Sequence, residues 1–329
     1  MNAKQIGALL LLSALWGGGF LFIRIAAPVL GPVVLIESRV LIAGVALLLY
    51  ALATRSPLNL RARWRHYLVI GIINSAIPFT LIATAELYLT SGLAATLIAT
   101  SPIFGAAVAA VWIKDTLTKN KVIGLVLGLL GVAVLIGWSP FPFSLTLAIS
   151  VAASLAAAAC YGIAGVYTKV YMHGAGSRAV ATCSQLGAAL FLLPLTFVAP
   201  SKHPPTPMVL LAVGALALLC TAVAYLLYFW LIEHAGPTRA LTVTFLAPVF
   251  GVLWGTVLLN EPLSLSTFIG FGTILMGTAL VTGVRIWKKS NVSPIEQLQR
   301  DDKERAFPNS ETPCVGGSGL GNALEEMKR

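Results

Sequence analysis

Two stretches of the chain decide its fold: residues 102–131, PIFGAAVAAVWIKDTLTKNKVIGLVLGLLG, and residues 248–277, PVFGVLWGTVLLNEPLSLSTFIGFGTILMG. They lie 146 positions apart and align without a gap. Chance alignment of apolar sequence gives scattered Leu and Val matches, whereas this alignment keeps proline, glycine and an acidic residue in register. The chain therefore contains an internal repeat. The matched positions are Pro102/Pro248, Phe104-Gly105/Phe250-Gly251, Asp115/Glu261, Ile123-Gly124/Ile269-Gly270, Gly131/Gly277 and Gly137/Gly283.

Upstream of these stretches the two copies match more weakly. Trp16-Gly17 resembles Tyr161-Gly162 at a shift of 145, and Arg24 falls against Lys169 at the same shift. We therefore expect the repeat to extend over most of the chain.

The composition is that of a membrane protein. Of 329 residues 57% are hydrophobic and 10% are charged, whereas a soluble domain carries about 25% charged residues. Lipid must therefore cover most of the surface. Cys160, Cys183 and Cys220 lie in apolar runs and Cys314 lies in a polar tail, without the spacing of a disulfide framework or a zinc site.

Ten apolar runs are each long enough to cross a membrane, which takes about 20 residues. The first run leads directly into the second without a cleavage site, so it is predicted to be a transmembrane helix and not a signal peptide. The predicted spans are residues 4–26, 32–53, 67–88, 91–113, 120–138, 145–168, 179–198, 208–232, 238–259 and 264–286.

The distribution of lysine and arginine predicts the orientation. With a cytoplasmic N-terminus, every Lys and Arg falls on the cytoplasmic side except Arg24 and Lys202 outside and Arg39 within a span. The net charge of +10 is thus a topology signal, and nucleic acid is not an expected partner. We expect both termini in the cytoplasm and, for the protein, the bacterial cytoplasmic membrane.

The predicted fold is an all-α integral membrane protein with ten transmembrane helices in an inverted 5+5 repeat. Five spans per copy is an odd number, so the second copy must enter from the opposite side. The predicted boundaries are residues 1–138, residues 139–287 and a disordered cytoplasmic tail over residues 288–329, which is too polar to offset its ordering entropy. Inverted repeats are typical of secondary transporters, whose substrate site lies near the midplane. Because one chain holds both copies, a monomer can suffice.

The chain resembles EamA-type members of the drug/metabolite transporter superfamily over roughly residues 5–285. The resemblance rests on Leu15-Trp16-Gly17, Arg39, the run from Ser91-Gly92 to Pro102, and the run from Pro248 to Gly277. It implies export or exchange of an amino-acid-like or other small metabolite. Members usually carry Gly-Glu after the fourth and ninth spans, where this chain has Lys114-Asp115 and Asn260-Glu261.

Prolines and polar residues within the spans are the candidates for a substrate cavity. Pro78, Pro102 and Pro248 each remove a helical hydrogen bond and are predicted to act as kinks or hinges; the alternative is packed kinks without a role. The polar side chains could equally form hydrogen bonds between helices, each of which contributes about 0.6 kcal/mol to helix association. As a set they suit a zwitterion or a neutral polar solute: Trp16, Asn74, Ser75, Thr100, Tyr161, Gln185, Tyr225 and Thr244.

Three charged residues within spans are candidates for an outer gate or a proton-coupling site: Glu37, Arg39 and Glu86. Glu37 and Arg39 point about 200° apart on a helix, so Arg39 is expected to pair with Glu86. The alternative is that the carboxylates reach water at the level of the lipid headgroups.

The chain shows no pattern of an ATP-driven or catalytic protein. It has no Walker A sequence and no midspan histidine, and its first span lacks the acidic residue that the small multidrug relatives carry. We expect no catalytic residue, metal or cofactor, and a small-molecule substrate. The competing classes are an integral membrane enzyme and a membrane protein that serves only as an assembly partner.

Overall fold

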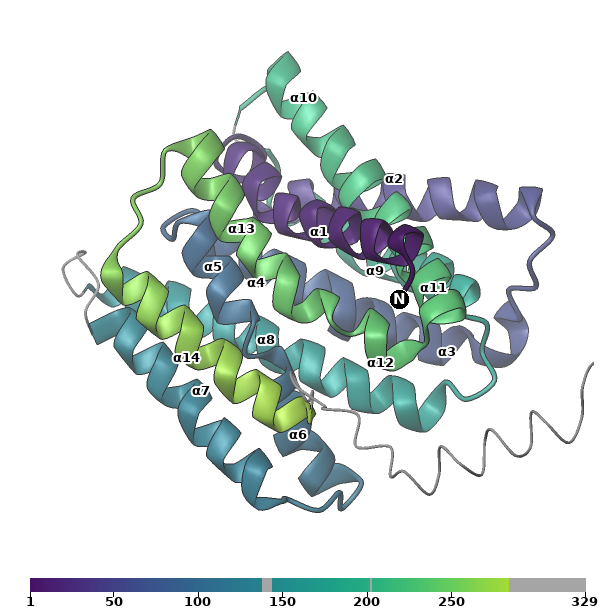
Figure 1. Ribbon diagram of the computed structural model, residues 1–329. Coiled ribbons are helices and arrows are strands. Elements are labelled where there is room, and N and C mark those ends of the chain that lie inside the picture. Colours follow the sequence, from purple (N-terminus) through teal and green to yellow (C-terminus); the bar gives the residue numbers. More distant parts are fainter. Residues whose placement is uncertain (138–143, 202, 284–329) are drawn as a thin grey trace, which may run out of the picture. The chain divides into compact units, whose positions relative to one another are not determined.

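The computed structural model describes residues 1–137, 144–201 and 203–283, and all regular structure in these ranges is helical (Figure 1). Nine helical stretches within them are long and apolar enough to cross a membrane, and a shorter apolar helix, Val243–Leu259, is the tenth. The ten helical segments expected from the sequence are therefore confirmed. The predicted tail lies outside the described residues.

The helices follow the chain in two sets of five spans. In the first set the spans are α1 (Ala3–Leu30), α2 (Pro32–Ala53), α3–η1–α4 (Leu60–Gly71, Ile72–Ala76 and Ile77–Ala85), α5–α6 (Ser91–Ile98 and Ser101–Trp112) and α7 (Lys119–Gly137). In the second set they are α8 (Leu145–Tyr171), α9 (Ser177–Val198), α10–η2–α11 (Pro207–Gly214, Ala215–Val223 and Ala224–Ala235), α12–α13 (Pro237–Ala240 and Val243–Leu259) and α14 (Leu265–Thr282).

Several spans begin at a side chain that accepts a hydrogen bond from the first turn of the helix. Asn2, Thr90, Ser144, Thr206 and Ser264 each accept from a backbone N–H of the helix that follows. Such caps satisfy one of the free N–H groups at a helix start. They fix where the spans begin, as the polar breaks in the sequence indicate.

The third span of each set contains a π-helical segment, which the hydropathy pattern does not indicate. These segments are η1, Ile72–Ala76, and η2, Ala215–Val223. Shifted by 146 positions, η1 falls on residues 218–222, inside η2. The two sets therefore share a backbone irregularity of a kind that is frequent at functional sites.

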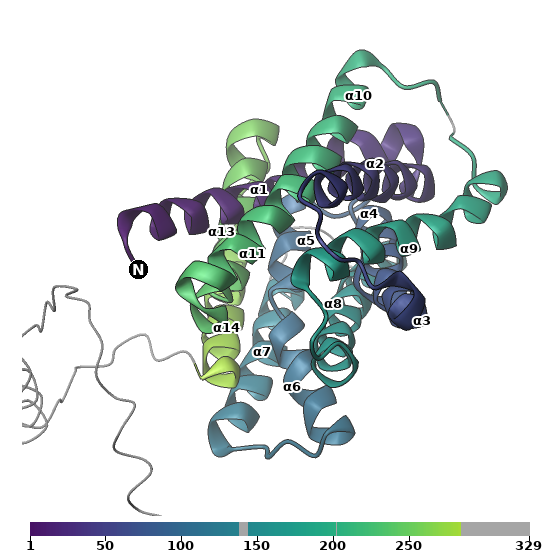
Figure 2. The same cartoon turned by 90° about the vertical axis from the view of Figure 1, so that its right-hand side faces the viewer.

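The fifth spans of the two sets, α7 and α14, pack along each other in Figures 1 and 2. A Cβ atom added to Gly124 would lie 2.5 Å from the carbonyl oxygen of Gly277, and one added to Gly131 would lie 2.9 Å from that of Gly270. The 146-residue shift carries Gly124 to Gly270 and Gly131 to Gly277, so it exchanges the two contacts. The contacts also run in opposite directions along the two helices, which makes α7 and α14 antiparallel.

A second pair of contacts is exchanged in the same way. Gly17 of α1 lies against Phe250 and Gly251 of α13, and Gly162 of α8 lies against Phe104 and Gly105 of α6. Glycine is required at both places, because an added Cβ would come within 2.6 Å of the opposing helix. In addition, α2 of the first set packs along α9 of the second.

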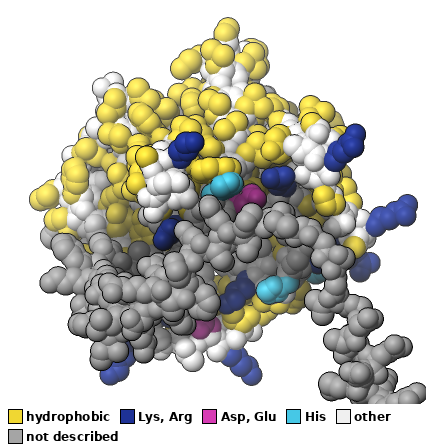
Figure 3. All heavy atoms as spheres, turned by 45° about the vertical axis from the view of Figure 1, so that its right-hand side comes forward, with side chains coloured by type: hydrophobic (Ala, Val, Ile, Leu, Met, Phe, Trp, Pro, Cys, Tyr) yellow, Lys and Arg dark blue, Asp and Glu magenta, His cyan; other side chains and the backbone are white. Residues whose placement is uncertain are grey.

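Large apolar side chains cover the outside of the described unit. Val111, Phe197 and Val198 are each more than four-fifths exposed. Figure 3 shows hydrophobic side chains over much of the described surface on one face, with Lys and Arg as separate patches. Such a surface suits contact with lipid.

Candidate functional site

Four residues from each set of spans form a central layer. They come from α1, α2, η1 and α4 in the first set, and from α8, α9, η2 and α11 in the second. A shift of 146 positions relates three pairs and a shift of 145 relates the fourth. The pairs are Arg39/Gln185, Ser75/Thr221, Phe79/Tyr225 and Trp16/Tyr161.

Two hydrogen bonds in this layer join one set of spans to the other. Arg39 Nε on α2 donates to Thr221 Oγ1 on η2 over 2.9 Å. Gln185 Nε2 on α9 donates to Ser75 Oγ on η1, also over 2.9 Å. The repeat shift converts either bond into the other, so the two π-helical segments present their hydroxyl groups to equivalent partners.

The aromatic contacts of the layer follow the same relation. The Arg39 guanidinium carbon lies 3.7 Å from the ring centroid of Phe79, and Gln185 Nε2 lies 3.5 Å from Tyr225 Oη. Between the sets, Tyr161 packs edge-on against Phe79 with ring centroids 6.3 Å apart. Trp16 packs edge-on against Tyr225 at 6.5 Å. Each set of spans thus contributes two aromatic rings to the layer, and each ring contacts a ring of the other set.

The two halves of the layer differ in charge. Arg39 is 7% exposed, and no carboxylate oxygen of the described residues lies within 4.0 Å of it. Its Nε atom bonds Thr221, and its two terminal nitrogens have no partner among the described residues. Gln185 lies at the equivalent position, and its Oε1 is buried without a partner in the described part of the chain. One half therefore offers a cation and the other an amide oxygen.

Six of the eight predicted cavity residues meet at this layer. Asn74 joins it because its Nδ2 lies 3.5 Å from Tyr225 Oη; the others are Trp16, Ser75, Tyr161, Gln185 and Tyr225. The hydroxyl groups of Thr100 and Thr244 instead donate to Leu97 and Leu241 carbonyls of their own spans.

Sequence reasoning missed Phe79 and Thr221 as members of the layer. The signal was present at the 146-residue shift, where they fall on Tyr225 and Ser75. Phe against Tyr and Thr against Ser are similar but not identical residues, and they lie outside the two stretches, 102–131 and 248–277, in which the repeat is strongest.

The expected ion pair between Arg39 and Glu86 does not form. Within the described ranges, the one ion pair within 4.0 Å joins Lys121 to Asp115. Arg39 instead bonds Thr221 and lies over the ring of Phe79, and these contacts make it part of the central layer. The carboxyl group of Glu86 is fully buried, and neither of its oxygens has a partner among the described residues.

Two further charged side chains, Arg24 and Glu37, lie on the first two helices. Arg24 belongs to α1 and donates to the main-chain carbonyl of Glu86. Glu37 is 6% exposed, and its Oε2 is buried without a partner in the described residues.

Glu261 holds the start of the fourth span. Its carboxylate accepts from Ser91 N at 2.7 Å, Ser91 Oγ at 2.9 Å and Gly92 N at 3.1 Å. These donors are at the N-terminus of α5, where a negative charge is favourable. Gly255 leaves room for this contact, since an added Cβ there would lie 2.3 Å from Glu261 Oε2. A residue that the sequence places at a membrane surface thus joins the two sets.

The three predicted hinge prolines differ in backbone setting. Pro78 starts α4 directly after η1, and Pro102 starts α6 after a break at Ala99–Thr100. Pro248 lies inside continuous α13, so Pro102 and Pro248 match in sequence without equivalent geometry. The Ile98 carbonyl that Pro102 frees accepts from Ser101 Oγ at 2.6 Å.

Two surface pockets lie outside the central layer. One, of about 530 Å³, is lined by the end of α1, the first turns of α2, the connection between α9 and α10, and α10 itself. The other, of about 290 Å³, lies between the ends of α2, α9 and α11, with Arg178 and Glu233 in its wall. No residue of the central layer lines either pocket. Among the described residues, no three His, Cys, Asp or Glu side chains converge as metal ligands would.

The chain belongs to the EamA-like transporter family. The family model matches twice, over residues 4–137 and residues 148–283. These two matches correspond to the two sets of spans and fit an internal repeat. Family membership points to a membrane transporter and not to an enzyme.

Similar proteins carry transporter names. The uncharacterized inner membrane transporter YedA of Escherichia coli strain K12 is 29% identical, covering 84% of this chain and 90% of that protein. The uncharacterized transporter YvbV of Bacillus subtilis is 28% identical, with 84% and 92% covered. An uncharacterized transporter of Archaeoglobus fulgidus is 25% identical, with 82% and 95% covered. A solved crystal structure shares the fold, with a TM-score of 0.62 at 20% identity over 86% of this chain and 97% of that one.

Proposed function

We propose that this protein is a secondary transporter that exports or exchanges a small amino-acid-like metabolite by alternating access. The substrate site is the central layer between the two sets of spans. The proposal rests on two observations. Arg39 is buried without an acidic partner among the described residues, and opposite it the amide oxygen of Gln185 has no hydrogen-bond partner among them. A buried charge that the protein itself does not pair is a functional candidate within a membrane.

An inverted 5+5 repeat over residues 1–138 and 139–287 is part of the proposal. The antiparallel course of α7 and α14 and the exchanged glycine contacts support it. The exchanged bonds of Arg39 and Gln185 support it further. In such a repeat, each half can adopt the conformation of the other, which moves access from one side of the membrane to the other around a fixed site.

The chemistry of the layer favours a solute with a carboxylate and a hydrogen-bond donor. The free terminal nitrogens of Arg39 suit a carboxylate, which guanidinium binds through two parallel hydrogen bonds. The Oε1 atom of Gln185 then accepts from the solute's ammonium group. Trp16 and Tyr161 form aromatic walls for the rest of the solute. A zwitterionic amino acid satisfies all of these groups.

The π-helical segments are the elements that we propose to move. η1 and η2 carry the hydroxyl partners of Gln185 and Arg39, and Pro78 follows η1 directly. A π-helical turn that reverts to α-helix shifts every side chain beyond it around the helix axis. Such a change would break one bond between the sets while keeping the other.

We place the protein in a bacterial cytoplasmic membrane with both termini in the cytoplasm, as the lysine and arginine distribution predicts. A monomer is sufficient for this mechanism, because both sets of spans and both halves of the layer come from one chain.

Counterflow tests the proposal. Proteoliposomes loaded with one unlabelled neutral amino acid at a time are diluted into the same labelled compound at trace concentration. A transporter makes the label accumulate transiently inside, because the trapped compound exchanges for it. Accumulation for at least one amino acid is expected. Its absence over a panel of amino acids and other small carboxylates would overturn the proposal.

A further inference from the structure

We propose that Glu86 is a proton-binding site, and that one proton moves with the solute in the same direction in each transport cycle. The inference rests on the proposed function, because it needs a solute bound at Arg39. It begins from a carboxyl group with 0% exposure and two oxygens that have no hydrogen-bond partner among the described residues.

The surroundings of Glu86 favour its neutral form in this conformation. An ionised carboxylate that is removed from water without a hydrogen bond is strongly unfavourable. Three charged groups lie on the elements packed around it: Arg24 of α1 bonds its main-chain carbonyl, Arg39 of α2 lies over Phe79 of α4, and Glu261 after α13 bonds Ser91 of α5. Neither arginine pairs with the carboxyl group, because Arg24 bonds the main-chain carbonyl of Glu86 and Arg39 bonds Thr221. Glu261 adds a negative charge.

The same neighbours provide a way for the proton to enter and leave. Glu261 holds α5 from across the repeat, and Arg24 holds the turn after α4 from α1. When these contacts open, water reaches Glu86 and the acid ionises beside two arginines. In the reverse step a hydronium ion transfers one proton to a carboxylate oxygen and leaves as water. The O–H bond formed on Glu86 balances the O–H bond broken on hydronium, and no electron is transferred.

The direction of coupling follows from Arg39, whose guanidinium group lies over Phe79 of α4. Glu86 caps the same helix seven residues further on, two helical turns along the same face, so the positive charge of Arg39 acts on Glu86 through a region of low dielectric constant. A solute carboxylate on Arg39 cancels the positive field that favours ionised Glu86, so it strengthens proton binding. By linkage, a proton on Glu86 strengthens solute binding by the same factor. Proton and solute therefore occupy the protein together and cross together. A solute that is concentrated inside the cell leaves with a proton.

The test uses proteoliposomes that contain the pH dye pyranine and the amino acid with the strongest counterflow in the panel. For the wild type, inward solute flux is expected to acidify the lumen, and an acidic exterior is expected to drive uphill accumulation of label. In Glu86→Gln, acid-driven accumulation divided by the variant's own counterflow rate is expected to fall at least tenfold. Glu86→Asp restores the carboxyl group and should recover part of the proton movement.

The matched control is Glu233→Gln, which removes an exposed carboxylate at the end of α11 and should keep the wild-type ratio. Luminal acidification that persists in Glu86→Gln overturns the proposal. So does a result in which Glu37→Gln abolishes the acidification and Glu86→Gln does not. Wild-type solute flux that leaves the lumen unchanged or makes it alkaline overturns it without any variant. Wild-type protein without counterflow contradicts the proposed function itself, and this result is obtained before a pH gradient is applied.

Discussion

Replacing Arg39 by glutamine makes the two halves of the central layer alike, since glutamine already occupies the equivalent position 185. Arg39→Gln removes the charge that we assign to the solute carboxylate, while its amide can still donate to Thr221. Losing one partner of a buried, hydrogen-bonded charge pair costs about 2–5 kcal/mol. Glutamine keeps a donor, so the lower half of this range, about 2–3 kcal/mol, applies. At 1.4 kcal/mol per tenfold, solute affinity should fall about 30- to 150-fold.

The assay is the concentration dependence of counterflow for an amino acid and for its carboxamide, which lacks the carboxylate. The wild type should prefer the acid, and Arg39→Gln should lose this preference because its half-saturation concentration rises for the acid alone. An equal loss for acid and amide would show that Arg39 acts only in packing. Unchanged affinity for the acid would refute the assignment of Arg39 to the carboxylate.

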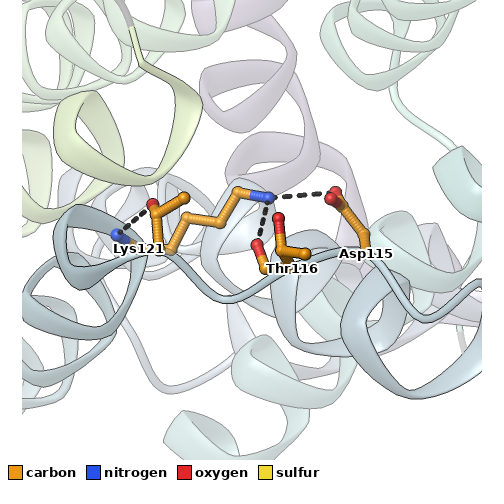
Figure 4. Close-up of polar contacts among 4 residues, drawn as sticks. Asp115, Thr116 and Lys121 are labelled. Atoms are coloured by element: carbon orange, nitrogen blue, oxygen red, sulfur yellow. Dashed lines mark hydrogen bonds and ion pairs between the residues drawn. The ribbon is translucent and has the colours of Figure 1, made fainter.

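Three further predictions concern stability. Glu261→Gln removes the charge that holds the start of α5 through Ser91 and should lower the free energy of unfolding by about 1–2 kcal/mol, measured by thermal unfolding in detergent; an unchanged midpoint would contradict it. Gly131→Leu places side-chain atoms of α7 against α14 and should lower the free energy of unfolding by about 1–3 kcal/mol. The control is Gly272→Leu on α14, where nothing lies within 4 Å of an added Cβ, and it should leave this free energy unchanged. Equal effects of the two substitutions would contradict close packing of α7 on α14. Lys121 Nζ lies 2.9 Å from Asp115 Oδ2 (Figure 4), and its charge lowers the pKa of this exposed carboxylate. The pair therefore stabilises the loop between α6 and α7 at neutral pH. This contribution is lost as the pH falls through the lowered pKa. The small stability difference between the wild type and Asp115→Asn should accordingly vanish in acid, and a difference that grows in acid would contradict this sign.

The spans and the repeat could be predicted because they depend on simple physical constraints. An apolar run of a given length must cross the bilayer as a helix, and the glycines at 124, 131, 270 and 277 mark places where two helices touch. The pairing of these glycines across α7 and α14 adds what the sequence alignment cannot show, which is how equivalent helices contact each other.

The central layer was predicted only in part, because hydropathy places a residue at a depth but not opposite a partner. The position of Arg39 along α2 does not predict that its long side chain bonds Thr221 on η2. Thr100 and Thr244 have midspan positions, but each satisfies its hydroxyl group within its own span. The π-helical segments carry no signal in hydropathy, since they change the helical repeat and not the composition.

Access to the central layer from both sides of the membrane is the most direct test of an alternating-access site. Asn74 is half-buried beside Tyr225, so Asn74→Cys, in a chain whose four native cysteines are replaced, reports on the layer. Membrane-impermeant thiol reagents are applied to intact cells and to inside-out vesicles, with and without the transported amino acid. For such a site we expect labelling from each side and protection by the solute on both. Labelling from one side only, or labelling that the solute does not slow, would contradict an alternating-access site between the two sets of spans.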